Sequence, residues 1–174
     1  MKLLLGLGGN TGGVPGTFRE ALETLAAADP VVGVLAVSSL YRSRPVGPPQ
    51  PDFWNQAALL ELRGSPVELL VLCQGLEESA GRDRGAETRW GPRPLDLDLL
   101  MAPAAVHRGP RLVLPHPRFH RRAFALVPAA ELVPHWLHPH LGRTVGELAA
   151  RTLAADPSAV WPVDRRPSRP PRDP

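Results

Sequence analysis

The alternation of leucine and aspartate at residues 95–99 is the sharpest hydrophobic pattern in the chain. Leu95, Leu97 and Leu99 alternate with Asp96 and Asp98, and a period of two is typical of a β-strand whose successive side chains point to opposite faces. The pattern predicts a strand with three leucines in the core and both carboxylates on the other face. The alternative is a half-solvated edge strand without a ligand.

Other apolar segments predict the rest of a small sheet with helices. Strands are expected over 2–10, 31–41 and 53–62, with a short extended piece over 111–114. Three segments carry the Ser/Thr-x-x-Glu spacing of a helix capping box, namely Thr17 to Glu20, Ser65 to Glu68 and Thr144 to Glu147. They predict helices over 17–28, 65–80 and 144–154.

The order of these elements, β-α-β-β-α-β, predicts an α+β fold with a ferredoxin-like core. We expect an antiparallel sheet in a three-layer αβα arrangement, with C-terminal additions. A length of 174 residues fits one domain, expected over 1–162. The Pro/Arg-rich tail 163–174 has little to bury, so disorder is expected there.

Positive charge is concentrated in one part of the chain. Residues 82–122 carry 9 basic and 4 acidic side chains, or +5, against a net charge of +3 for the whole chain. A focused patch suits a small polyanion, whereas a nucleic-acid binder usually shows a broader basic surface. No apolar run reaches the ~18 residues of a membrane span. Cys73 is expected as a buried small hydrophobe, and the protein is expected to be cytoplasmic.

The candidate chemistry follows from the carboxylate pair and the arginines before it. Mg²⁺ prefers hard oxygen ligands and often takes one or two carboxylates together with substrate phosphates. Arginine contacts phosphate oxygens through two parallel hydrogen bonds, and four arginines lie among glycines and prolines upstream, namely Arg82, Arg84, Arg89 and Arg93. The combination predicts a site for a nucleoside polyphosphate with Mg²⁺. The alternative for the arginines is an ordinary soluble surface.

Other motifs leave alternatives open. The glycines of 6–9 match neither the phosphate-loop nor the dinucleotide pattern, which favours a tight turn before a helix. Gln74 and Glu77 can meet on one helix face or form a solvated stripe. Residues 42–52 are a passive connector or a binding loop, and residues 115–124 (PHPRFHRRAF) lack zinc-site spacing and fit a basic surface helix.

Three blocks, SSLYRSRPVGPPQPDFWNQA, GRDRGAETRWGPRPLDLDLL and LVLPHPRFHRRAF, closely resemble the 6-hydroxymethyl-7,8-dihydropterin pyrophosphokinase family of folate biosynthesis. The resemblance covers roughly residues 2–135. It implies transfer of pyrophosphate from ATP to the pterin hydroxymethyl group, with release of AMP. It also implies two Mg²⁺ ions, ATP as co-substrate, and a monomer without nucleic-acid or membrane partners.

The resemblance also implies roles for individual residues. Asp96 and Asp98 are expected as metal ligands and, with Arg82 and Arg93, as catalytic residues. The pterin is expected to contact Ser43, Val46, Phe53, Asn55, Trp90 and Phe124. ATP is expected to contact Gln74, Glu77, Arg84, Leu99, Arg111, His116 and Arg122. The loops 42–52 and 82–94 are expected to close over the substrates.

The chain departs from the family pattern at three positions: Gly9, Arg44 and Val113. Two other classes of function remain as alternatives. One is a ferredoxin-like RNA-binding module, which would be expected to carry an aromatic run that this sequence lacks. The other is a pterin- or nucleotide-binding protein without catalysis.

Overall fold

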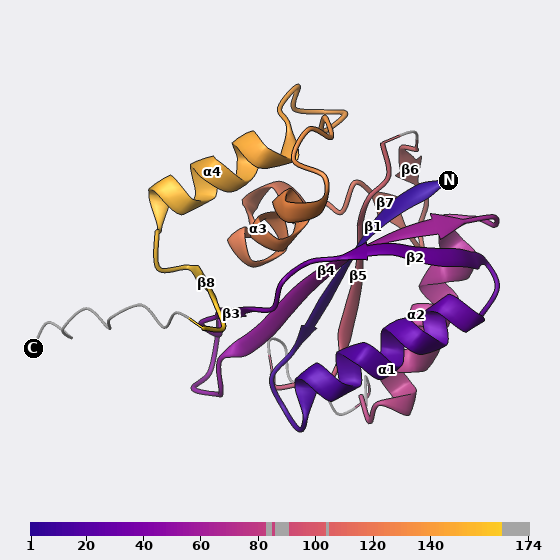
Figure 1. Cartoon of the computed structure of the whole chain (residues 1–174), viewed down its shortest axis with the longest axis horizontal. Helices are drawn as coiled ribbons and strands as arrows, with labels where there is room; N and C mark the ends of the chain where they lie inside the picture. Colours follow the sequence, from indigo (N-terminus) through magenta and orange to yellow (C-terminus); the bar gives the residue numbers. More distant parts are fainter. Residues whose placement is uncertain (83–84, 86–90, 104, 165–174) are drawn as a thin grey trace, which may run out of the picture.

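The computed structural model describes residues 1–82, 85, 91–103 and 105–164, which form three layers (Figure 1). The middle layer is an antiparallel sheet in the order β5-β1-β4-β3-β8, and β2 also pairs with β4. Its strands are β1 (Lys2–Gly9), β2 (Val31–Val37), β3 (Tyr41–Ser43), β4 (Phe53–Leu62), β5 (Asp96–Met101) and β8 (Val160–Pro162). The order β5-β1-β4-β2 is ferredoxin-like, which confirms the predicted fold class.

Helices cover both faces of the sheet (Figure 1). One face carries α1 (Val14–Ala27) and α2 (Pro66–Ser79), and the other carries α3 (Ala123–Leu132), α4 (Val145–Ala155) and the short 3₁₀ helix η1 (Phe119–Arg121). A two-stranded hairpin of β6 (His107–Arg108) and β7 (Val113–Leu114) lies beyond β5 in the chain.

The alternation of side chains along β1 and β5 divides the core in two. Leu3, Leu5 and Leu7 of β1 pack with α1 and α2, whereas Leu4 packs with α3 and α4. The three predicted core leucines, Leu95 just before β5 and Leu97 and Leu99 within it, are 1%, 4% and 4% exposed. Each buried leucine contributes roughly 1.5–3 kcal/mol relative to exposure, so this side of β5 holds the strand firmly in register.

Two helix starts and one strand match the sequence prediction closely. The predicted strand over 53–62 is β4, and the capping boxes of Ser65 and Thr144 are both formed. The predicted capping box at Thr17 is wrong. The helix α1 already begins at Val14, and its N-cap is Gly13, which offers no side-chain cap. Pro15 occupies the first turn of α1. Proline suits this turn because its fixed φ matches the helix, and because a backbone N–H there would have no acceptor within the helix.

The single strand predicted over 31–41 is wrong, because it is interrupted between β2 and β3. The Ser38 hydroxyl accepts a hydrogen bond from the N–H of Ala57 at 2.9 Å and donates one to the carbonyl of Ser39 at 2.8 Å. A side chain thus takes the place of a backbone partner in the ladder. Glu131 of α3 accepts from the N–H of Ser39 and from the Tyr41 hydroxyl, which ties this break to the opposite helix layer.

The helix α3 was not predicted at all. Its sequence, AFALVPAAEL, is apolar nearly throughout, so it has no clear period of three or four, and Pro128 lies inside it. The basic surface helix considered for 115–124 is only η1, in which Phe119 is fully buried.

Two predictions about the chain as a whole have different outcomes. Within the described residues, no helix is long and apolar enough to cross a membrane. The predicted disorder of 163–174 stays a prediction, because all but the first two of those residues lie outside the described part of the chain.

Candidate active site

The two carboxylates of β5 lie on the face of the sheet that α3 covers. Asp96 and Asp98 line a small cavity with Asn55 of β4 and Phe124 of α3. Because β5 is an edge strand, its backbone on one side is free of strand pairing in the described structure. The strand thus presents both carboxylates, as predicted, from a rigid support.

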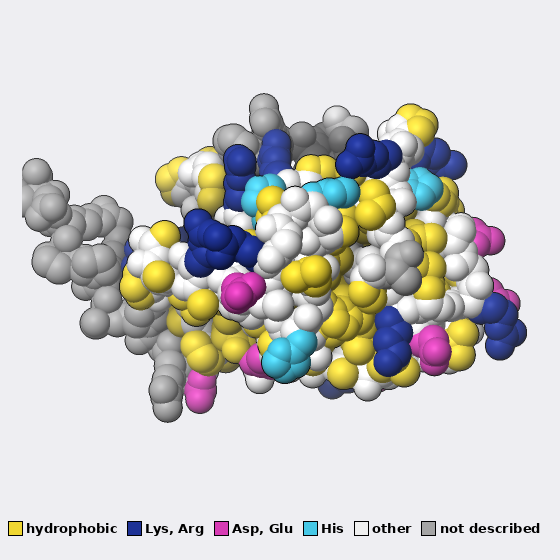
Figure 2. Space-filling view, turned by 90° about the horizontal axis from the view of Figure 1, so that it is seen from above, with side chains coloured by type: hydrophobic (Ala, Val, Ile, Leu, Met, Phe, Trp, Pro, Cys, Tyr) yellow, Lys and Arg dark blue, Asp and Glu magenta, His cyan; other side chains and the backbone are white. Residues whose placement is uncertain are grey.

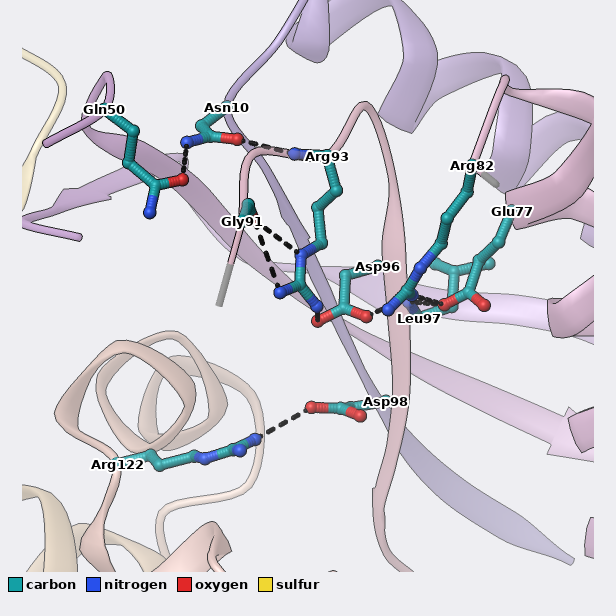
Figure 3. A network of polar contacts seen from close by, with 10 residues as sticks. All are labelled: Asn10, Gln50, Glu77, Arg82, Gly91, Arg93, Asp96, Leu97, Asp98 and Arg122. Carbon is teal, nitrogen blue, oxygen red and sulfur yellow. Dashed lines mark hydrogen bonds and ion pairs between the residues drawn. The ribbon is translucent and has the colours of Figure 1, made fainter. Parts of the chain in front are cut away.

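A buried glutamate and two arginines surround Asp96 (Figure 3). The Arg82 guanidinium donates to Asp96 at 2.5 Å and to Glu77 at 2.8 Å, and Arg93 lies 3.3 Å from the other oxygen of Asp96. Glu77, on α2, is 2% exposed and also accepts from the backbone N–H of Leu97 at 2.7 Å. Glu77 is therefore not part of a solvated stripe; it joins α2, β5 and Arg82.

Asp98 has a separate cationic partner. Arg122, just before α3, donates to Asp98 at 3.0 Å, and its guanidinium lies 5.5 Å from the centre of the Phe124 ring. Burial raises the pKa of Asp98, and the negative charge of Asp96 raises it further; His116 and Arg122 act in the opposite direction. Two nearby carboxylates with this tendency are suited to bind cations.

His116 lies beside this pair at the end of β5. Its backbone N–H donates to the carbonyl of Leu100 at 2.7 Å, and its Nδ1 accepts from the N–H of Arg118 at 3.1 Å. Burial lowers the pKa of His116, although Asp98 opposes this shift. Arg111, predicted for the same ligand, is exposed on the connection between β6 and β7.

A cavity of about 130 Å³ opens beside the carboxylates and gathers five of the predicted pterin residues. Those five are Ser43, Val46, Phe53, Asn55 and Phe124, and Arg93, Asp96 and Arg122 line the same cavity. Asn55 is 3% exposed, and its side-chain amide donates to the Ser43 hydroxyl at 2.9 Å. The predicted substrate residues and the carboxylate and arginine groups thus share one cavity.

Two predicted nucleotide residues contribute differently. Gln74 is half-buried on α2, one turn before Glu77. The Leu99 side chain is in the core, but backbone groups two residues apart on a strand point the same way. The N–H of Leu97 points away from β1 to Glu77, so the backbone of Leu99 also faces the open edge of the sheet. Arg84, Arg89 and Trp90 lie outside the described residues.

Sequence reasoning missed Asn10, which connects three loops (Figure 3). Its side chain accepts from the N–H of Arg93 at 2.9 Å, and its amide donates to Gln50 at 2.9 Å and to the carbonyl of Pro51 at 3.0 Å. Asn10 is 7% exposed. An asparagine after a Gly-rich strand end was the available signal, since such residues bond to the backbone of turns.

Gly9, noted as a departure from the family pattern, has a steric reason. A Cβ at this position would lie 2.5 Å from the carbonyl oxygen of Pro94. Glycine thus allows the segment of Arg93 and Pro94 to lie directly against the end of β1. Nothing in the described structure explains the choice of valine at Val113, which is 42% exposed.

The donor set fits Mg²⁺ held together with a phosphate ligand. Within the described residues, no group of three or more His, Cys, Asp or Glu side chains could hold a metal ion. Two carboxylates on one strand face, Asp96 and Asp98, supply hard oxygen donors, and Mg²⁺ often completes its coordination with water and substrate phosphates. Asp96 and Asp98 are the residues that would hold it.

Comparison with known proteins identifies the family of this chain. Residues 4–134 match the family model described as 7,8-dihydro-6-hydroxymethylpterin-pyrophosphokinase. Two relatives are named 2-amino-4-hydroxy-6-hydroxymethyldihydropteridine pyrophosphokinase. The chain is 42% identical to the Synechocystis protein over 92% of this chain and 79% of the relative. It is 40% identical to the Methylorubrum extorquens protein over 94% of this chain and 99% of that relative.

A solved structure of the Plasmodium falciparum HPPK-DHPS chain has the same fold. It superposes with a TM-score of 0.64 at 13% identity, over 88% of this chain and 45% of that chain. This chain therefore spans less than half of the Plasmodium chain, and at this identity the likeness shows the fold alone. The family match and the two relatives place the chain in the 7,8-dihydro-6-hydroxymethylpterin-pyrophosphokinase family.

Proposed function

We propose that this chain transfers pyrophosphate from ATP to 6-hydroxymethyl-7,8-dihydropterin, giving the pterin diphosphate and AMP. The family match supports this reaction. The observation that carries it is the shared cavity, in which Phe53, Asn55 and Phe124 lie next to Asp96 and the arginines. A flat aromatic substrate and a phosphate ligand with its metal can therefore meet in this cavity.

The pterin lies in this cavity between Phe53 and Phe124, because offset stacking of a flat heterocycle on aromatic rings supplies contact energy. Asn55 offers a donor and an acceptor for the amide edge of the pterin, and Ser43 holds its side chain at 2.9 Å. Val46 borders the same cavity. Trp90, proposed to cover the pterin, lies outside the described residues.

ATP lies along the carboxylate face of β5, where Asp96 and Asp98 would hold two Mg²⁺ ions. Bound Mg²⁺ neutralises charge on the triphosphate. The adenine meets the backbone of Leu99 at the open edge of the sheet. The remaining contacts come from Gln74, Arg84, Arg111, His116 and Arg122. Arg82 and Arg93 already lie at Asp96, so their guanidinium groups are within reach of phosphate oxygens bound near that carboxylate.

The chain's own residues supply positioning and positive charge. The hydroxymethyl oxygen of the pterin forms a bond to the β-phosphorus and loses its proton to solvent. The bond from the β-phosphorus to the oxygen that bridges it to the α-phosphorus breaks, and AMP leaves with that oxygen. Arg82, Arg93 and Arg122 stabilise charge on the transferred group, and the stacked pterin is oriented for in-line attack. Glu77 fixes Arg82 through a 2.8 Å hydrogen bond and is better described as a positioning residue than as a direct nucleotide contact.

The test is nucleotide analysis after the protein is mixed with ATP, Mg²⁺ and 6-hydroxymethyl-7,8-dihydropterin. Pterin-dependent AMP without ADP is the expected result. ADP would instead indicate transfer of the γ-phosphate, and no turnover of a folded protein would favour a binding protein without catalysis. Omission of Mg²⁺, with EDTA present, is expected to abolish AMP formation. Addition of excess Mg²⁺ is expected to restore it.

Further properties remain predictions. The domain boundary at residue 162, the monomeric state, the cytoplasmic location and the absence of nucleic-acid partners rest on the sequence. Closure of the loops 42–52 and 82–94 over the substrates also stays a prediction, and much of the second loop lies outside the described residues.

A further inference from the structure

A second concave site lies beside the proposed pterin cavity. This groove has a volume of about 610 Å³. Its lining includes residues 43–46, the segment around η1, and residues 155, 156, 158 and 159 at the end of α4 and just beyond it. Binding sites for small molecules typically measure roughly 300–1,000 Å³. The groove shares Ser43, Arg44, Val46, Arg122 and Phe124 with the pterin cavity, but neither Asp96 nor Asp98 lines it.

The groove is strongly basic. Four arginines line it, namely Arg44, Arg118, Arg121 and Arg122, and the single carboxylate among its lining residues is Asp156. That carboxylate accepts hydrogen bonds from the backbone N–H and the hydroxyl of Ser158, at 2.9 and 2.8 Å. The face of the molecule that carries α3 and α4 shows basic and histidine side chains gathered along the upper edge of Figure 2.

Three of these arginines have no acidic ion-pair partner in the described part of the chain. Among the described residues, no carboxylate lies within ion-pair distance of Arg44, Arg118 or Arg121, whereas Arg122 pairs with Asp98. All three are exposed. Like charges that converge on one concave surface raise the local potential and attract an anion, and arginine is the side chain best suited to phosphate oxygens.

The rest of the lining is apolar. Pro45, Val46, Ala123, Ala155 and Ala159 contribute hydrocarbon surface, and Phe124 adds an aromatic ring. A ligand that satisfies both parts carries a phosphate or diphosphate group on an apolar or aromatic body. We propose that the groove is a second anion site that binds an organic phosphate of this kind, separate from the triphosphate site at Asp96 and Asp98.

Arg122 connects the two sites. It donates to Asp98 at 3.0 Å and also lines the groove, so an anion in the groove competes with Asp98 for the same guanidinium. Occupation of the groove is therefore expected to lower the rate of AMP formation. Only this consequence rests on the proposed function; the binding itself does not.

The experiment uses phenyl phosphate as the probe, titrated into the ¹⁵N-labelled full chain with Mg²⁺ and saturating α,β-methylene-ATP, which occupies the triphosphate site. Saturable shifts of the backbone amides of Ala155, Ser158 and Ala159 are expected. Phenol, which has the same ring without the charge, is expected to give no saturable shift. Shifts confined to amides around Asp96, no saturable shift, or equal binding of phenol would each overturn the proposal.

Substitutions of arginine test whether phenyl phosphate binding depends on the groove or on positive surface charge in general. Arg118→Ser with Arg121→Ser is expected to weaken phenyl phosphate binding by about tenfold or more, since two charge-assisted contacts are lost. The matched control, Arg63→Ser with Arg143→Ser, removes the same charge from exposed positions that do not line the groove. Arg44→Ser tests the opposite wall, which Arg44 shares with the pterin cavity. Equal weakening by the control pair would overturn the proposal, and AMP formation without phenyl phosphate reports separately on the proposed function.

Discussion

Asn10 and Arg93 lie 83 residues apart in the chain but hold each other by two hydrogen bonds. The Arg93 N–H donates to the Asn10 side chain, and the Asn10 N–H donates to the Arg93 carbonyl, both at 2.9 Å. The Asn10 amide also binds Gln50 and Pro51. One buried side chain therefore fixes the segment that carries Arg93 relative to the loop that borders the pterin cavity.

Asn10→Ala is expected to lower kcat/KM for both substrates by about tenfold or more, because a small misplacement of reacting groups is costly. Loss of buried hydrogen bonds is expected to lower the free energy of unfolding by about 1–3 kcal/mol. Steady-state kinetics and urea unfolding measure the two effects.

Gln50→Ala serves as the comparison for Asn10→Ala, because it leaves both bonds between Asn10 and Arg93 in place. It is expected to raise the KM for the pterin more than the KM for ATP. Wild-type kinetics in Asn10→Ala would show that the connection between the loops has no role in catalysis.

Glu77→Gln keeps the size of the side chain but removes the charge that holds Arg82. We expect kcat to fall by about tenfold, with the KM for the pterin nearly unchanged, because Arg82 loses orientation at Asp96. Glu78→Gln is the matched control, since Glu78 is the exposed neighbour on α2. An equal effect of both substitutions on kcat would contradict a specific role for Glu77.

His138 makes stability depend on pH. It is 4% exposed, and burial lowers its pKa below 6.5, with His120 and His140 adding to the shift. The unfolded chain therefore binds the proton more readily than the folded one. The contribution of neutral His138 to the free energy of unfolding is fully present above about pH 6.5, the pKa in the unfolded chain. It is lost as the pH falls from that value through the lower pKa of the folded chain.

The rings of His120 and His140 each lie 6.0 Å from the ring of His138, so a proton on His138 would lie close to both. In urea unfolding at pH 5.5 and 7.5, His138→Gln is expected to lose less stability on acidification than the wild type. His135→Gln, at an exposed position, is expected to behave like the wild type. If His138→Gln lost as much stability on acidification as the wild type, the pH dependence would belong to other groups.

The sequence was most informative where a local rule acts alone. The period of two in residues 95–99 placed both carboxylates correctly, and the capping boxes of Ser65 and Thr144 located the helix starts. The same rule failed at Thr17, because the preceding Gly13 and Pro15 start the helix earlier. A spacing that is correct for a cap does not decide between two competing starts.

Features that depend on distant residues could not be predicted. The break after β2 requires the hydrogen bond between Ser38 and Ala57, and α3 is recognisable only by the sheet face that it covers. The family resemblance supplied the pterin residues, and the cavity brings five of them together. The hydrogen bonds of Asn10 and the basic groove both depend on loops that meet only in the folded chain.

The most direct test of the account is the rate of AMP formation by Asp98→Asn. This substitution keeps the shape of the side chain but removes a charged metal ligand, and a loss of about hundredfold or more is expected from lost electrostatic stabilisation. Asp164→Asn, at an exposed position after β8, is the matched control and is expected to retain full activity. If folded Asp98→Asn formed AMP at a rate close to the wild type, the assignment of the carboxylate pair as the metal site would be wrong.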